Sequence, residues 1–244
     1  MYTYEKPDNL VDWYESSFKR FADNTLFLVK TEKNPLHPIT YKEIGTRIDN
    51  LRGALAHLGL KKGESVGIIS KNRPEWVVIE VAAYGCGARY IPMYEKELYE
   101  TWKYIIKDGN VKFLFVPNEE IYKRVKGLVD EIPTLEKIFI IDAEGENSLP
   151  ALEKLGESHP VESIKPLFSD TAVIIYTSGT TGEPKGVELT HGNLTYCSRA
   201  GYNIYPELNE TKIALTMLPW AHSYAISGEL HNWVNFGGAM GFME

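Results

Sequence analysis

Cysteine is nearly absent from this sequence, and long apolar runs are missing altogether. Cys86 and Cys197 are the only two cysteines among 244 residues, they lie far apart, and no CxxC pair is present. A cysteine zinc site is therefore excluded, and a reducing cytoplasm is the expected compartment. No run reaches the roughly 20 apolar residues that span a bilayer, and the first residues are not of signal-peptide type. We therefore do not expect the protein to span a membrane.

Positively charged residues are outnumbered by negatively charged ones. The 26 Lys and Arg stand against 33 Asp and Glu, which gives a formal net charge of −7. This balance argues against a protein that coats nucleic acid, so small molecules or other proteins are the expected partners. Contact with a membrane surface needs only an exposed apolar or basic face. The sequence leaves such a peripheral contact open, and it leaves the oligomeric state open as well.

The residues that are present have the composition of a folded globular protein. Hydrophobic residues make up 43% of the chain and charged residues 24%, which excludes a disordered chain or a fibrous repeat. A length of 244 residues suffices for one large domain or two small ones with a substantial core. The basic cluster Lys123, Arg124 and Lys126 lies on an expected amphipathic helix, and we interpret it as a solvated helix face.

From Thr40 onward, short apolar runs alternate with segments of helical period. The clearest helix follows Thr40, which forms a capping box with Glu43, and Gly59 is placed to end it. Such alternation indicates βαβ units, and it predicts an α/β fold with a doubly wound, mostly parallel sheet and flanking helices. Strands are expected over 65–70, 88–93, 112–116, 137–141, 172–176, 212–217 and 239–243, and helices over 41–58, 75–84, 97–107, 119–130, 149–157, 191–202 and 222–235.

Residues 142–170 have the most linker-like composition in the chain, with two glycines and three prolines among polar residues. The alternation of strand-like and helical segments nevertheless continues on the far side. We interpret the segment as a long connection within the fold and not as a domain boundary.

A glycine-rich segment follows the predicted strand 172–176. Residues 177–186 contain three glycines, four hydroxyl side chains and Lys185. Glycines let backbone N–H groups approach an anion, hydroxyls donate hydrogen bonds to phosphate oxygens, and lysine adds a mobile positive charge. The segment is therefore predicted to hold phosphate at the carboxyl end of a strand, where ligands bind in open α/β sheets.

Two common phosphate-binding motifs do not fit this segment. A Walker A loop requires Gly-Lys-Ser/Thr, whereas Lys185 follows Pro184 and precedes Gly186. The GxGxxG dinucleotide fingerprint fails because no glycine stands two residues before Gly179. An ordinary P-loop NTPase and a Rossmann oxidoreductase are both disfavoured.

The order Tyr-Thr-Ser-Gly-Thr-Thr-Gly-Glu-Pro-Lys-Gly-Val over 176–187 resembles the signature loop of the adenylate-forming, AMP-binding superfamily. That superfamily includes acyl-CoA synthetases, luciferases and peptide-synthetase adenylation domains. The flanking segments 170–176 and 187–193 and the earlier blocks 71–76 and 87–94 match its general layout. The block Leu-Pro-Trp-Ala-His-Ser-Tyr over 218–224, with Glu229-Leu230, is similar to long-chain fatty acyl-CoA synthetases.

The resemblance implies an acid–thiol ligase that uses ATP, Mg²⁺ and coenzyme A. A fatty acid carboxylate attacks the α-phosphorus of ATP, pyrophosphate leaves, and the thiol of coenzyme A then displaces AMP. Charge on the departing pyrophosphate is neutralised by the loop, by Lys185 and by Mg²⁺. The phosphate-contacting residues implied by position are Thr177, Ser178, Gly179, Thr180, Thr181, Gly182 and Lys185.

Two residues are implied to act in catalysis, namely Lys185 and His222. His222 would sit near the substrate carboxylate and the mouth of the acyl tunnel, although an isolated histidine beside apolar residues is often a hydrogen-bonded structural side chain. Thr181 is the weak candidate for Mg²⁺ contact, through the ATP phosphates. His191 is interpreted as a helix-start residue, His231 has no motif support, and the three histidines together indicate no metal site.

The sequence does not decide whether Trp220 and Trp233 line an acyl channel or fill the core. The family's later motifs for adenine, ribose and the C-terminal-domain lysine are not found before Glu244. We therefore expect residues 1–244 to be the N-terminal portion of an AMP-binding domain, inactive alone, with the rest of the large domain and the C-terminal domain missing. Two alternatives stay open: an adenylation enzyme for another acid or for carrier-protein loading, and a non-catalytic nucleotide-binding fragment.

Overall fold

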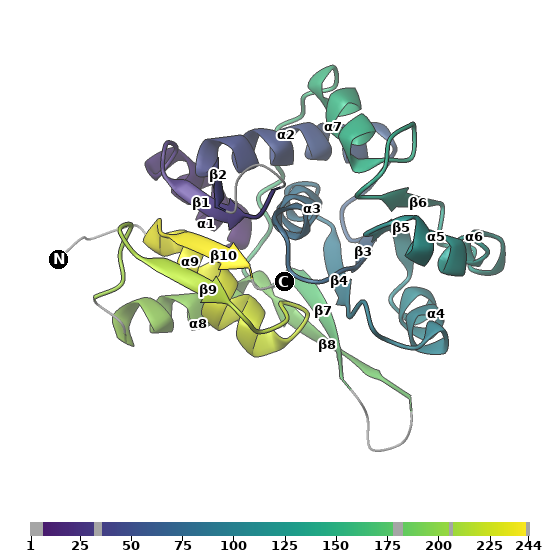
Figure 1. The fold of residues 1–244 in the computed structure, drawn as a ribbon. Coiled ribbons are helices and arrows are strands. Elements are labelled where there is room, and N and C mark those ends of the chain that lie inside the picture. Colours follow the sequence, from purple (N-terminus) through teal and green to yellow (C-terminus); the bar gives the residue numbers. More distant parts are fainter. Residues whose placement is uncertain (1–6, 32–35, 178–182, 205–206, 243–244) are drawn as a thin grey trace.

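The computed structural model describes residues 7–31, 36–177, 183–204 and 207–242, and it arranges them around two sheets (Figure 1). The larger sheet has the strand order β6 (Lys137–Ile140), β5 (Val111–Val116), β3 (Ser65–Ile69), β4 (Arg89–Met93), β7 (Thr171–Thr177) and β8 (Lys185–Thr190). The smaller has the order β2 (His37–Thr40), β1 (Thr25–Val29), β10 (Ala239–Phe242) and β9 (Ile213–Thr216). All neighbours run parallel except β7 with β8 and β1 with β2. The predicted α/β class with mostly parallel sheets is confirmed.

Helices cover both faces of the larger sheet. The described helices are α1 (Leu10–Arg20), α2 (Tyr41–His57), α3 (Pro74–Gly85), α4 (Tyr99–Asp108), α5 (Glu119–Val125), α6 (Leu128–Glu131), α7 (Leu149–Glu157), α8 (His191–Ile204), the π-helix η1 (Ala225–His231) and α9 (Asn232–Phe236). Alternate residues of β5 belong to two separate apolar clusters, because side chains on a strand alternate between faces. Phe113 and Phe115 join the cluster of α1, α2 and α3, whereas Leu114 and Val116 join the cluster of α4 and α5.

Helix α3 lies between the two sheets (Figure 1). Nearly every residue from Pro74 to Gly85 is buried, as expected for a helix that is apolar all round. Its cluster contains Val66 of the larger sheet and both Phe27 and Met240 of the smaller sheet. The helix therefore joins the two sheets into one core.

Residues 142–170 connect two strands of the larger sheet, β6 and β7, and so do not form a domain boundary, as predicted. It carries α7, which packs against α2, and it leads into β7, which pairs with β4 through Tyr90 and Val173. The two helices cross with little space between their backbones. A Cβ built on Gly156 would lie 1.6 Å from the backbone oxygen of Asn50, so no larger residue fits this crossing.

Several elements differ from the sequence predictions. The helix expected over 119–130 is divided into α5 and α6, with Gly127 as the N-cap of the second. The helix expected over 222–235 begins at Ser223 and has π-helical geometry from Ala225 to His231 before it continues as α9. Strand β8 forms in a segment interpreted as loop, and the elements before Thr40 were not predicted.

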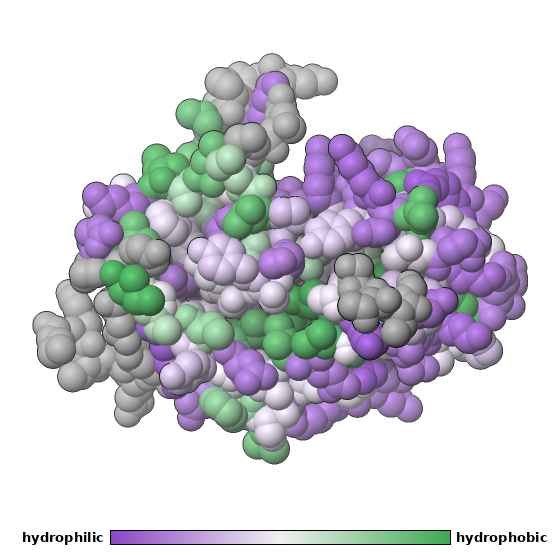
Figure 2. All heavy atoms as spheres, turned by 90° about the horizontal axis from the view of Figure 1, so that it is seen from below, coloured by the Kyte–Doolittle hydropathy of each residue, from purple (hydrophilic) through white to green (hydrophobic). Residues whose placement is uncertain are grey.

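Two predictions concern the surface, one face of which carries hydrophilic and hydrophobic residues side by side (Figure 2). Lys123, Arg124 and Lys126 are exposed on α5 and just after it, as expected, and the Arg124 guanidinium lies 4.3 Å from the centroid of the Trp102 ring. Within the part of the chain that the structure describes, no helix combines the length and apolar character that crossing a bilayer requires.

Candidate functional site

The glycine-rich segment connects β7 to β8 in an antiparallel hairpin that projects from the body of the molecule (Figure 1). Thr177 and Lys185 are paired across the hairpin, and both are exposed. The hairpin starts at the carboxyl end of β7, the edge at which open α/β sheets bind ligands. The remaining predicted phosphate contacts, Ser178, Gly179, Thr180, Thr181 and Gly182, lie outside the described residues, and so does the proposed Mg²⁺ contact of Thr181.

The end of β7 beside the glycine-rich segment is tied to helix α4. The Tyr176 hydroxyl donates a hydrogen bond of 2.7 Å to Oδ2 of Asp108, the last residue of α4. A carboxylate at the carboxyl end of a helix interacts unfavourably with the helix dipole. Asp108 therefore stabilises this region through its hydrogen bond to Tyr176 and not through the dipole. Burial and the neighbouring Asp108 carboxylate both raise the pKa of Tyr176, which therefore stays a hydrogen-bond donor at neutral pH.

The block that contains His222 follows strand β9. His222 is exposed, its backbone N–H donates to the Pro219 carbonyl at 3.0 Å, and its Nδ1 accepts the Tyr224 N–H at 3.3 Å. These bonds form a tight turn directly before the π-helix. The ring therefore lies on the surface, attached to a backbone turn that is held locally.

Asn72 is a residue of this region that sequence reasoning did not single out. Its Nδ2 donates to Thr216 Oγ1 at 3.1 Å and to the Leu218 carbonyl at 2.8 Å, and its Oδ1 accepts the Trp220 N–H at 2.8 Å. The residue lies just after β3, at the carboxyl edge of the larger sheet. A polar residue directly after a buried strand is a signal that could have drawn attention to it.

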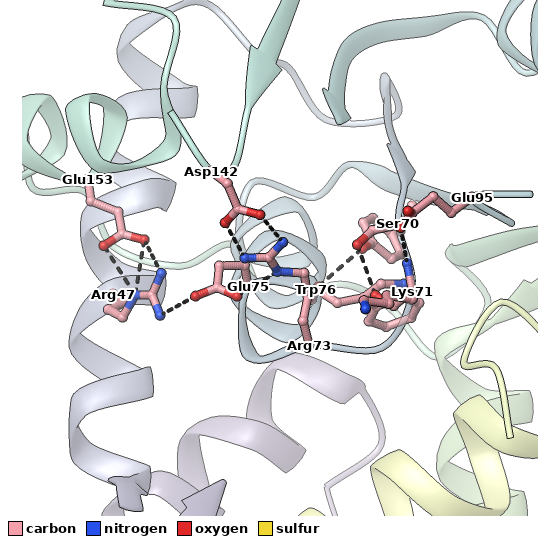
Figure 3. Close-up of polar contacts among 10 residues, drawn as sticks. Arg47, Ser70, Lys71, Arg73, Glu75, Trp76, Glu95, Asp142 and Glu153 are labelled. Carbon is pink, nitrogen blue, oxygen red and sulfur yellow. Dashed lines mark hydrogen bonds and ion pairs between the residues drawn. The ribbon is translucent and has the colours of Figure 1, made fainter. Parts of the chain in front are cut away.

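An ion-pair network holds the loop that carries Asn72 (Figure 3). Arg73 binds both oxygens of Asp142, at 2.8 and 2.5 Å, and its Nε donates to Glu75 at 2.8 Å. Arg47 of α2 bridges Glu75 at 3.1 Å and Glu153 of α7 at 3.0 Å. Burial by itself would raise the pKa of Glu75, but the charges of the two arginines outweigh it and lower that pKa. The first turn of α3 is thus fixed by α2, α7 and the end of β6.

The other histidines and the two tryptophans have structural positions. His191 begins α8, as predicted, and its Nδ1 accepts the Leu10 N–H at 3.3 Å. Trp220 is fully buried, which decides for the core and against a channel wall. Trp233 is half-buried, and its Nε1 donates to the Ala239 carbonyl at 2.9 Å. Among the described residues, no three His, Cys, Asp or Glu side chains converge as a metal site would require.

Four buried titratable side chains of α1, α3 and η1 lie close together, away from the hairpin. The Tyr84 hydroxyl donates to Glu80 at 2.9 Å, and the Tyr14 hydroxyl lies 3.3 Å from Glu80 Oε2 and 2.8 Å from His231 Nδ1. All four side chains are fully buried. Burial raises the pKa of Glu80 to about 8, although its tyrosine bonds oppose the shift, and it lowers the pKa of His231 to about 3. Both groups are therefore neutral at pH 7.

This cluster predicts a specific pH dependence of stability. Because the pKa of Glu80 is raised from 4.5 to about 8, its stabilising contribution is complete below the unfolded value and is lost as the pH rises through the folded one. The lowered pKa values of His191 and His231 act below about pH 6.5. From about pH 6.5 to 8.5 we expect the wild-type free energy of unfolding to fall by about 1–2 kcal/mol relative to Glu80→Gln. Urea titrations of both proteins across this range measure the difference, and parallel curves would contradict it.

Comparison with known proteins identifies a matching family and several relatives. Residues 15–244 match the family described as AMP-binding enzyme. Long chain acyl-CoA synthetase 6 of Arabidopsis thaliana, a peroxisomal protein, is 32% identical over 219 residues, which cover 84% of this chain and 31% of that protein. Fatty acyl-CoA synthetase A of Dictyostelium discoideum is 34% identical over 202 residues, which cover 76% of this chain and 30% of that protein.

Solved structures share the fold. A long-chain-fatty-acid–CoA ligase from Archaeoglobus fulgidus superposes with a TM-score of 0.82 at 25% identity, covering 99% of this chain and 47% of that one. ATP-bound MatB from Rhodopseudomonas palustris gives a TM-score of 0.78 at 21% identity, covering 96% and 45%; at that identity the likeness shows the fold alone. The chain spans about a third of the length of the curated relatives it matches.

Proposed function

Because this chain belongs to the AMP-binding enzyme family, we propose that its protein activates a long-chain fatty acid in two steps. ATP and the carboxylate first give an acyl-adenylate and pyrophosphate, and coenzyme A then gives the acyl-CoA and AMP. The observation that carries the proposal is the hairpin, in which Lys185 is paired with Thr177 at the carboxyl end of β7. The named relatives support the fatty-acid class of substrate.

The residues of the hairpin have the chemistry that the first step needs. Adenylyl transfer to a carboxylate, with pyrophosphate as the leaving group, needs no protein nucleophile, so positioning and charge neutralisation supply most of the catalysis. Lys185 is exposed and free to meet a β- or γ-phosphate, and Thr177 offers a hydroxyl opposite it. When bound, Mg²⁺ would add charge neutralisation on the same phosphates, with the hydroxyl of Thr181 as its contact on the protein.

The turn at His222 is the proposed contact for the substrate carboxylate. Asn72 links this turn to the end of β3, and β3 is parallel to β4 and β4 to β7. The hairpin therefore starts at the same carboxyl edge of the larger sheet to which Asn72 links the His222 block, which itself follows β9 of the smaller sheet. An exposed imidazole at that edge is available to a carboxylate that approaches the α-phosphate of ATP.

We further propose that residues 1–244 form the N-terminal portion of an adenylation domain whose adenine and ribose contacts lie in later sequence. The matched third of the relatives' length supports this. Sequencing the reading frame beyond codon 244 tests it. Several hundred further codons of family sequence are expected, and a stop codon directly after Glu244 would favour the non-catalytic fragment.

The substrate assignment is tested by product analysis of the whole protein with ATP, coenzyme A and saturated fatty acids of increasing chain length. We expect acyl-CoA, AMP and pyrophosphate, with the highest kcat/KM for long-chain acids. A carrier-linked thioester in place of acyl-CoA would support the carrier-loading alternative. The absence of product at every chain length would reject a fatty acid as the substrate.

A further inference from the structure

Four residues form a closed ring of hydrogen bonds, three of them between side chains and one from a backbone N–H. Asn72 Nδ2 donates to Thr216 Oγ1 at 3.1 Å, and the Thr216 hydroxyl donates to Glu229 Oε1. The same Glu229 oxygen accepts the Trp220 Nε1–H at 3.3 Å, and the Trp220 backbone N–H donates to Asn72 Oδ1 at 2.8 Å. The four residues come from three separate parts of the sequence.

The orientation of the Asn72 amide is determined by its partners. The Leu218 carbonyl, at 2.8 Å from Nδ2, can only accept, and the Trp220 backbone N–H, at 2.8 Å from Oδ1, can only donate. A flipped amide would place two donors together and two acceptors together, so this assignment is the only one that satisfies both contacts. Both amide hydrogens and the amide oxygen are used.

Two of the hydrogen-bonded residues, Thr216 and Trp220, flank a short segment that has no regular secondary structure. Residues 217–219 lie between the end of β9 and the turn at His222, and all three are exposed. Their two ends are held in the interior, because Thr216 is only 3% exposed and Trp220 is fully buried. The Trp220 ring lies 5.5 Å from Trp76 of α3 and 5.7 Å from Phe242 of β10. An exposed loop is thereby attached to a rigid part of the core.

The ring also joins the carboxyl ends of strands from both sheets. Asn72 follows β3 of the larger sheet, Thr216 ends β9 of the smaller sheet, and Glu229 belongs to the π-helix. The loop before α3 is itself held by Arg73 and its ion pairs (Figure 3). A shift between the sheets would break the ring, and a broken ring would release the His222 turn.

We propose that Asn72 and Glu229 are positioning residues for substrate activation, because their ring fixes segment 217–222 and with it the direction of His222. The proposal rests on the function assigned to His222 above. Neither residue needs to touch the substrate. Their contribution is to hold a surface turn in one place relative to the phosphate-binding hairpin, and a displacement of about 1 Å at a reacting group costs up to roughly 100-fold in rate.

Thr216 offers the sharpest test because its variants separate the hydroxyl from the shape of the side chain. Thr216→Val keeps the shape and removes the hydroxyl that links Asn72 to Glu229, whereas Thr216→Ser keeps the hydroxyl. In the whole protein we expect Thr216→Val and Asn72→Ala to lower kcat with the fatty acid roughly 10- to 100-fold, with an unchanged KM for ATP and unchanged hydrogen-exchange protection of α2. Thr216→Ser is expected to retain most of the activity.

Hydrogen exchange tests the ring independently of catalysis. In Asn72→Ala the Trp220 amide loses its acceptor, so peptides covering 216–224 should exchange about tenfold faster while those of α2 stay protected. Asn209→Ala is the matched control, because Asn209 accepts the Thr211 N–H at 3.0 Å in the turn before β9, outside the ring. It should change neither readout.

The outcomes separate this proposal from the proposed function. Faster exchange with unchanged kcat in Asn72→Ala would overturn the positioning role and leave the enzyme assignment intact. Unchanged exchange would overturn the ring itself, and equal losses in Thr216→Ser and Thr216→Val would show that the hydroxyl is not what matters. A wild-type protein with no activity toward any acid would instead reject the proposed function, and with it the role given to His222.

Discussion

Trp220→Ala should lower the free energy of unfolding by about 3–5 kcal/mol, the range expected when a buried tryptophan is truncated. The Trp220 ring is fully buried between α3 and the smaller sheet, 5.5 Å from Trp76, 5.7 Å from Phe242 and 6.3 Å from Phe27. Truncation would leave a cavity at the junction of the sheets and would remove a donor from Glu229. Both effects act on the one core that joins the two halves of the fold.

Equilibrium denaturation in urea, followed by far-UV circular dichroism, measures this loss. Trp233→Ala is the matched control, because Trp233 is a tryptophan that is only half-buried and lies in α9. Its loss should be clearly smaller. Equal losses for the two variants would contradict the role of Trp220 as a core residue beside α3.

Lys185→Ala should weaken the use of ATP by roughly 1.5–3 kcal/mol, the value of one hydrogen bond to a charged group. This corresponds to a fall of roughly 10- to 150-fold in kcat/KM for ATP. Lys185 is the first residue of β8 and is exposed opposite Thr177, at the base of the predicted phosphate loop. Its positive charge is placed to meet the charge that develops on pyrophosphate.

Lys137→Ala is the matched control for this measurement. Lys137 is likewise an exposed first residue of an edge strand, β6, at the opposite edge of the same sheet. Steady-state kinetics with ATP as the varied substrate should show a loss for Lys185→Ala and none for Lys137→Ala. Unchanged kinetics in both variants would show that Lys185 is only a solvated charge.

Apolar patterning was sufficient to predict the larger sheet. All residues of β3 and β5 are buried, because helices cover both faces of a parallel sheet, and such strands form continuous apolar runs in the sequence. The capping box of Thr40 and Glu43 could be predicted for a different reason, because both of its residues lie within one helical turn. Predictions succeeded where the determining contacts are local or where burial is complete.

Strand β8 could not be predicted in this way. Its first four residues are exposed, so it has no apolar pattern, and it is formed by backbone pairing with β7. Strand β1 depends on even more distant residues, because Phe27 pairs with Met240 near the other end of the described chain. Pairing partners of this kind are fixed by tertiary structure and leave no signal in a short window of sequence.

The candidate site shows the same division. The phosphate loop was recognised from its residue types, and the structure adds that Thr177 and Lys185 face each other in a hairpin. The block 71–76 was noted, but the role of Asn72 within it was not predicted, because its partners Thr216 and Trp220 are 144 and 148 residues away in the sequence. Only the fold brings an amide after one strand to the end of a strand in another sheet.

Acid-dependent exchange of labelled pyrophosphate into ATP by the whole protein tests the central claim most directly, because the reversal of acyl-adenylate formation returns pyrophosphate to ATP only when the acid is present. The account predicts exchange that requires a long-chain fatty acid, does not require coenzyme A, and falls strongly in Lys185→Ala. Cleavage of ATP to ADP and phosphate, or the absence of exchange with every carboxylic acid while ATP still binds, would contradict it.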